Sequence, residues 1–128
     1  MISKTKILVG VDGSEQSKKA LAEAVTIAKC FSGSMKAVTV FQQGMENKAE
    51  EILSEAKLLL EKEKVQYTTL SILGSNPSRA LQSIAKEENF DLIVVGNRGL
   101  GGTAALLLGS VSRQVVTDAV CNVLVVKK

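Results

Sequence analysis

Apolar residues change their spacing several times along this chain, and each change predicts a new element of secondary structure. Continuous apolar runs, which are typical of strands buried on both faces, predict strands over Ile7–Val11 and Asp91–Gly96. Runs rich in apolar and β-branched residues predict three more, over Met35–Phe41, Val65–Leu73 and Asn122–Val126. The pattern therefore predicts five strands.

Between these strands, apolar residues recur at steps of three and four, which is the spacing of an amphipathic helix. The spacing predicts helices over Ser14–Phe31, Glu46–Lys64 and Ser110–Ala119, and another that begins at Asn76–Pro77. Asn is a typical capping residue, and a proline suits the first position of a helix. In the first helix the predicted apolar stripe consists of Leu21, Ala24, Val25, Ala28 and Phe31.

Strands and helices alternate strictly in this prediction. Such alternation, with strands that are apolar on both faces, is typical of a parallel sheet with helices on each side. We therefore expect a doubly wound α/β fold, and the length of 128 residues suits one domain over residues 1–128. Right-handed crossovers leave a few strand orders open.

The composition excludes several kinds of chemistry. The chain has no histidine, so a Ser-His-Asp or Cys-His nucleophile and a His-based zinc site are excluded. The net charge is only +3 and the aromatic residues are few, namely Phe31, Phe41, Phe90 and Tyr67. A protein that binds nucleic acid by stacking needs more of both, so we expect no nucleic-acid partner.

The two cysteines and the apolar runs bear on the cellular location. Cys30 and Cys121 form no CxxC motif, and we expect both to pack as small hydrophobic residues. No apolar run approaches the 18 or more residues that span a bilayer, and the run at Ile7–Val11 is too short for a signal peptide. We therefore expect a cytoplasmic protein without a membrane segment.

Five of the ten glycines lie between Gly96 and Gly109. This connection ends with Ser110 at a predicted helix start, where free backbone N–H groups favour an anion. Glycine lets the backbone approach a phosphate closely, and Arg98 and Arg113 add positive charge. The segment is either a phosphate-binding loop or a flexible connection, and the residues alone leave both interpretations open.

Two well-known phosphate motifs almost fit this segment. Residues 96–103 match GxxxxGK[ST] except that Gly102 replaces the lysine, which removes the ammonium that contacts the β- and γ-phosphates. Residues 99–104 fit GxGxxG/A but follow the fourth strand, and no acidic residue ends the following strand to bind a ribose. The sequence therefore supports neither a P-loop ATPase nor a dehydrogenase.

Asp12 follows the first predicted strand, at the edge of the sheet where ligands bind in such folds. Its carboxylate could bind ribose hydroxyls or help to hold a metal ion on phosphates. It could equally cap the first helix, alone or with Ser14. The residues do not choose between these roles.

These segments together resemble the universal stress proteins that bind ATP. That family carries a G-2x-G-9x-G-(S/T) signature, and this chain has the similar pattern Gly96-x2-Gly99-x9-Gly109-Ser110. The resemblance extends to the segments Ile7–Ser14, Asp91–Gly96, Leu107–Ser112 and Asn122–Val126, so it covers nearly the whole chain. It implies a five-stranded parallel sheet with strand order 3-2-1-4-5, helices on both faces, and a fold like that of the adenine nucleotide alpha hydrolases.

The resemblance also implies a site for ATP, with or without Mg²⁺. Adenine would lie near Val11 and Val40, and Asp12 matches the acid near ribose and phosphates. The positions that match the wall and the phosphate contacts are Val95, Gly96, Arg98, Gly99, Gly109, Ser110, Val111 and Ser112. Asn97 stands where the family often has Ser or Thr, so it is a weaker candidate. The short connection over residues 42–45 is expected to leave the adenine pocket more open.

Members of the family form homodimers through the last strand, which here contains Val123, Leu124, Val125 and Val126. An apolar edge strand is a liability unless it is paired, so the same dimer is expected here. The implied function is a small regulatory or stress-response protein in which bound nucleotide alters contacts with a protein partner.

Efficient catalysis is not expected, because neither a P-loop lysine nor a convincing general base is visible. Slow hydrolysis or self-phosphorylation at Ser110 or Ser112 stays open. The alternative function is a dimeric interaction module with the same fold and no nucleotide, for which a degraded glycine signature would be expected; here the signature is complete. A flavin-binding electron-transfer domain is a third hypothesis, and colourless purified protein would count against it.

Overall fold

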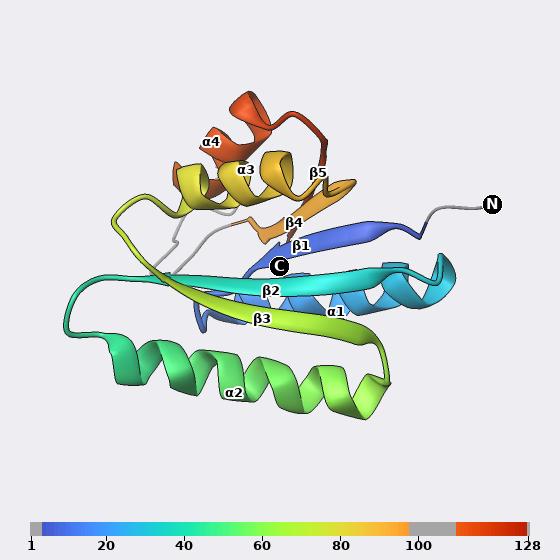
Figure 1. Ribbon diagram of the computed structural model, residues 1–128, viewed down its shortest axis with the longest axis horizontal. Coiled ribbons are helices and arrows are strands. Elements are labelled where there is room, and N and C mark those ends of the chain that lie inside the picture. The colour runs from blue at the N-terminus through green and yellow to red at the C-terminus, as the bar shows by residue number, and fades with distance from the viewer. Residues whose placement is uncertain (1–3, 98–109, 128) are drawn as a thin grey trace.

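The computed structural model describes residues 4–97 and 110–127 of the chain (Figure 1). The strands of its sheet are β1 (Lys6–Gly10), β2 (Ser34–Phe41), β3 (Gln66–Leu73), β4 (Leu92–Gly96) and β5 (Asn122–Val126). The helices are α1 (Glu15–Cys30), α2 (Glu46–Glu63), α3 (Pro77–Glu87) and α4 (Ser110–Asp118). Each predicted element is present, with bounds that differ by a residue or two where they differ.

The strands form one parallel sheet in the order β3-β2-β1-β4-β5. This arrangement confirms both the predicted fold class and the strand order that the family resemblance implied. The order reverses at β1, which pairs with β2 on one side and β4 on the other. In such a sheet the loops that leave adjacent strands at the reversal point diverge, and a crevice opens between them.

Helices lie on both faces of the sheet. Figure 1 shows α1 and α2 on one face and α3 and α4 on the other. The first core cluster packs the α1 and α2 stripes on alternate residues of the central strands, such as Ile7 and Val9. The second cluster packs α3 and α4 on the strand residues that point to the other face of the sheet, such as Leu8 and Ile93. Residues of the central strands are thus buried from both sides, as their continuous apolar runs predicted.

Two predicted core residues are exposed. Phe31 is 64% exposed because α1 ends at Cys30, so Phe31 lies beyond the buried stripe. Cys30 is exposed as well, which makes its prediction as a packed residue wrong, whereas Cys121 is partly buried against the second core cluster. Strand β3 is an edge strand in which exposed and half-buried residues largely alternate.

Within residues 4–97 and 110–127, no helix combines the length and the apolar character that crossing a bilayer requires.

Candidate functional site

A cavity of about 300 Å³ opens at the carboxyl edge of the sheet, at the point where the strand order reverses. Strands β1, β2 and β4 supply its floor, and the first turns of α1, α3 and α4 or the residues just before them supply its walls. The lining residues are Gly10, Val11, Asp12, Ser14, Ser17, Val38, Val40, Pro77, Leu81, Val95, Gly96, Ser110, Val111 and Ser112.

Every predicted site residue that the structure describes lines this one cavity. These residues are Val11, Asp12, Val40, Val95, Gly96, Ser110, Val111 and Ser112, and they come from four separate segments of the sequence. The predicted residues Arg98, Gly99 and Gly109 lie outside the described residues. The weaker candidate Asn97 is buried beside the cavity and is not part of its lining.

The turn between β1 and α1 shows which side chain caps α1. Ser14 is the N-cap of α1, since its side chain accepts a hydrogen bond of 3.1 Å from the Ser17 backbone N–H. Asp12 Oδ1 accepts a bond of 2.9 Å from the Ser14 N–H, and so fixes the turn that precedes the cap. The Asp12 side chain is otherwise exposed at the cavity. The capping role thus belongs to Ser14, and Asp12 has a free side facing the cavity.

Close packing explains why residue 96, the last residue of β4, is a glycine. A Cβ at this position would lie 2.8 Å from the Gln16 Cβ and 2.9 Å from the Gln16 backbone carbonyl carbon. Backbone atoms cannot move aside as the end of a side chain can, so α1 reaches β4 only because residue 96 has no side chain. The first turn of α1 is therefore placed against one side of the crevice by this contact.

Hydrogen bonds join the end of β4 to α4 and β5. The Ser112 Oγ donates to the backbone carbonyl of Asn97 at 2.8 Å, and the Asn97 N–H donates to the Val126 carbonyl at 2.8 Å. Ser112 is buried and its hydroxyl proton is engaged, whereas Ser110 is exposed at the first position of α4. Of the two serines considered for self-phosphorylation, Ser110 is the accessible one.

Six lining residues were not predicted, namely Gly10, Ser14, Ser17, Val38, Pro77 and Leu81. Two patterns in the sequence could have identified part of this set. Val38 precedes Val40 by two residues, so both point to the same face of β2. Pro77 and Leu81 are four residues apart on a helix that starts at the carboxyl edge of the sheet, so they share one helix face.

The cavity has an apolar end and a polar end. Val38 and Val40 lie at the β2 side, and Leu81 packs over Gly10 of β1; these side chains suit a flat, weakly polar ring. Serine hydroxyls and the N-terminus of the nine-residue helix α4 lie at the β4 side, where they suit an anion. Asp12 is the one charged side chain in the described lining, and the described residues contain no group of three or more His, Cys, Asp or Glu side chains that could hold a metal ion. This lining suits a small ligand that has both an apolar part and an anionic part.

Comparison with known proteins places the chain among relatives of one family. The model of the universal stress protein family matches residues 4–127. A universal stress protein of Thermus aquaticus is 35% identical, over 94% of this chain and 97% of that protein. The Bacillus subtilis universal stress protein YxiE is also 35% identical, over 95% of this chain and 98% of its own.

A solved structure extends the comparison to a ligand complex. The crystal structure of a universal stress protein in complex with cAMP has a TM-score of 0.79 and 27% sequence identity, and the match covers 98% of each chain. The family model, the similarity of the curated relatives and the shared fold agree over almost the whole length of the chain. We conclude that this chain belongs to the universal stress protein family.

Proposed function

We propose that the cavity at the carboxyl edge binds an adenine nucleotide, such as ATP with or without Mg²⁺. The base lies against Val11 and Val40, and the Asp12 carboxylate accepts hydrogen bonds from ribose hydroxyls or helps to hold a metal ion. The phosphates lie toward Ser110 and the first turn of α4. Arg98, Gly99 and Gly109, which lie outside the described residues, complete the proposed phosphate contacts through the glycine signature.

One observation carries this proposal. The residues that the family signature and the strand ends indicate come from segments that are far apart in the sequence, and all those described line a single cavity with chemically distinct ends. The similarity to a universal stress protein solved with cAMP supports the adenine nucleotide class. The apolar end of the cavity does not by itself select a particular base. The assignment to adenine nucleotides therefore rests on the cavity and on the similarity to the cAMP complex together.

The proposed role is binding and signalling in the cytoplasm. The described lining holds no cationic side chain and no histidine that could act as a general base. Nucleotide occupancy is expected to alter the contacts that the α4 side of the molecule offers to a protein partner. The protein acts as a homodimer in this proposal, paired through the edge of β5 at Val123, Leu124, Val125 and Val126.

The direct test is calorimetric titration of the purified protein with AMP, ADP, cAMP and ATP, the last with and without Mg²⁺. Denaturing the purified protein and analysing the released small molecules first shows whether a nucleotide was already bound. The variant Val40→Phe fills the base end of the cavity, and we expect it to weaken binding by about tenfold or more, which corresponds to about 1.4 kcal/mol.

The matched control is Val116→Phe, which makes the same change at a 47% exposed position of α4 outside the cavity lining. It should bind nucleotide as the natural protein does. Equal affinities for both variants would show that the site is wrongly placed. Absence of binding by every nucleotide would favour the alternative function, a dimeric interaction module that binds none.

A further inference from the structure

The floor of the cavity continues beyond its edge onto the outermost strand. In the register of the sheet, Val38 pairs with Leu70 and Val40 pairs with Ile72. Paired residues of neighbouring parallel strands point to the same face. Leu70 and Ile72 therefore extend the apolar floor from β2 to β3, and we call these two residues the shelf.

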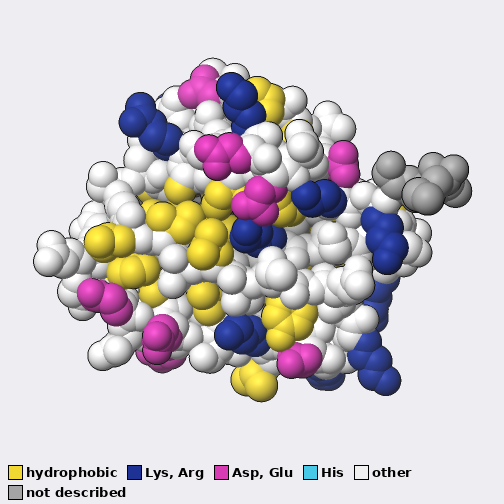
Figure 2. Space-filling view, viewed as in Figure 1, with side chains coloured by type: hydrophobic (Ala, Val, Ile, Leu, Met, Phe, Trp, Pro, Cys, Tyr) yellow, Lys and Arg dark blue, Asp and Glu magenta, His cyan; other side chains and the backbone are white. Residues whose placement is uncertain are grey.

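The shelf is open because the helices above the sheet do not extend over β3. The principal sheet contacts of α3 are with β1, β2 and β4, whereas β3 packs on β2 and on α2, which lies on the opposite face. Leu70 is 36% exposed and Ile72 is half-buried against the second core cluster. Figure 2 shows hydrophobic side chains gathered on the open surface between α3 and α2.

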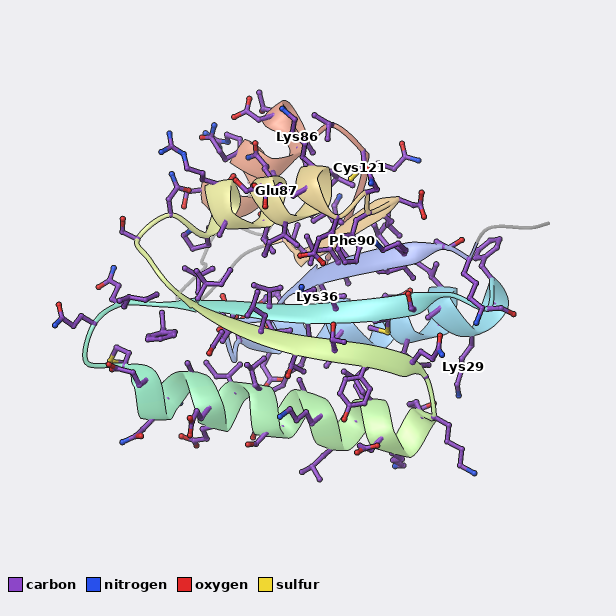
Figure 3. All side chains as sticks on the ribbon, in the orientation of Figure 1. Lys29, Lys36, Lys86, Glu87, Phe90 and Cys121 are labelled. Atoms are coloured by element: carbon purple, nitrogen blue, oxygen red, sulfur yellow. The ribbon has the colours of Figure 1, made fainter. Side chains whose placement is uncertain are left out.

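The shelf has a defined end. Toward the amino ends of the strands, the same face carries Lys36 and its partner in register, Thr68. The Lys36 ammonium lies 3.0 Å from the Glu88 carboxylate, so its charge is already paired there (Lys36 is labelled in Figure 3). The apolar surface is therefore short along the strands and suits a compact group rather than a long chain.

The strand order places the shelf next to the base end of the proposed nucleotide. A ligand with its phosphates at β4 and its base at β2 already crosses β1, and β3 is the next strand on the same line. Neighbouring strands are about 4.8 Å apart, so one ring or a short branched alkyl group attached to the base is enough to reach the shelf.

We infer that this site accepts adenine nucleotides that carry a compact apolar substituent on the base, and that Leu70 and Ile72 bind that substituent. The inference rests on the proposed function. The continuity of the cavity floor with the shelf favours one small ligand over a separate protein segment, because a ligand bound at Val40 already brings the base to the edge of Leu70 and Ile72.

The test compares AMP with AMP analogues that carry a benzyl group on N6 or a phenyl group on C2 or C8, using calorimetric titration. Each analogue's affinity is divided by the affinity of AMP for the same protein. At least one analogue is expected to bind about threefold or more tightly than AMP, because its ring removes apolar surface from water. That gain is expected to disappear in Leu70→Thr, which removes apolar side-chain surface and introduces a β-branched residue that suits a strand.

The matched control is Leu73→Thr on the same strand. Leu73 is three residues from Leu70, so it points to the opposite face, and it is 60% exposed. The ratio of analogue affinity to AMP affinity in Leu73→Thr should equal the ratio in the natural protein. The inference is overturned if AMP binds but no analogue binds more tightly, or if the gain survives in Leu70→Thr. If AMP and all analogues fail to bind, the proposed function itself is overturned.

Discussion

At the scale of single residues, the two thiols lie in different surroundings. Cys30 is exposed at the end of α1, whereas Cys121 is partly buried between α4 and β5. Burial raises the pKa of the Cys121 thiol, and the nearby negative charge of Asp91 raises it further. Since the thiolate is the reactive form, Cys121 should react slowly with a thiol reagent in the native protein. Figure 3 labels Cys121.

Labelling the folded protein with a chromogenic disulfide reagent near pH 8 should therefore give one fast and one slow phase. Cys30→Ser should remove the fast phase, and Cys121→Ser should remove the slow one. A fast phase that persists in Cys30→Ser would show that Cys121 is more accessible than the structure indicates.

An ion pair between two helix ends gives a second prediction at this scale. The Lys29 ammonium near the end of α1 lies 2.6 Å from Glu63 Oε1 at the end of α2 (Lys29 is labelled in Figure 3). This hydrogen bond, and then the charge of Lys29, lower the pKa of Glu63 from its ordinary value of 4.5. The contact therefore stabilises the folded state above pH 4.5, and the stabilisation is lost as the pH falls through the lowered pKa of Glu63.

In Lys29→Met, the pKa of Glu63 should rise toward its ordinary value, which carboxyl-detected NMR titration can follow. The carboxyl signal of Glu23, an exposed acid elsewhere on α1, serves as the reference within the same sample. An unchanged pKa of Glu63 in the variant would mean that the pair does not persist in solution.

At the scale of elements, the start of α3 depends on one side chain. Asn76 is the N-cap, and its Oδ1 accepts a hydrogen bond of 3.0 Å from the Arg79 N–H. Asn76→Ala should lower the free energy of unfolding by about 1 kcal/mol, because this N–H then has no partner within the helix. Asn76→Asp keeps an acceptor oxygen and should retain most of the stability. Urea unfolding of the three proteins measures both effects, and equal stabilities would show that the cap contributes nothing.

Most elements were predictable because a period of 2 or 3.6 residues is a local property of the sequence. The prediction was wrong at Phe31 because apolar character alone does not show where α1 ends, and backbone closure at the end of a helix is not visible in the pattern. The interpretation as strands buried on both faces suited β1 and β4, whereas the exposure of β3 could not be predicted from its local pattern. An edge strand is exposed because of its position in the sheet, and that position is a property of the whole fold.

The candidate site was predictable to a similar degree. Asp12 could be placed because it follows the carboxyl end of a predicted strand, where ligands of such sheets bind. Val11 and Val95 were placed only by the family resemblance. Pro77 and Leu81 were missed because their contribution depends on how α3 crosses the sheet. The role of Asp12 stayed open because a carboxylate after a strand suits a turn and a ligand equally well, and only the geometry of Ser14 assigns the cap.

At the scale of the whole molecule, the position of β5 leads to a prediction about assembly. Among the described residues it is an edge strand that pairs with β4 alone, and Val123, Leu124 and Val125 are half-buried there. An apolar edge favours pairing with a second copy about a twofold axis. Light scattering should show a dimer at micromolar concentration. Val125→Glu should shift the protein toward the monomer, because the twofold axis brings the two new charges near each other.

The matched control is Val116→Glu, which adds the same charge on the exposed surface of α4. It should remain a dimer. A natural protein that is monomeric at micromolar concentration would rule out this assembly.

The strand order could not be derived from alternation, because several windings share the same local pattern. Right-handed crossovers restrict the choice without completing it. The order depended on the family resemblance, and the register of β1 with both β2 and β4 then explains why residues near positions 12, 40 and 96 meet in one crevice.

The backbone of Asn97 forms hydrogen bonds with two different elements. Its carbonyl holds the first turn of α4, and its amide holds the last residue of β5. A bound ligand that shifts α4 toward the cavity should therefore also shift β5, the strand at which two copies are expected to meet. By thermodynamic linkage, dimerisation would then change the affinity of the subunits for the ligand by the same factor by which the ligand changes the affinity of the two subunits for each other.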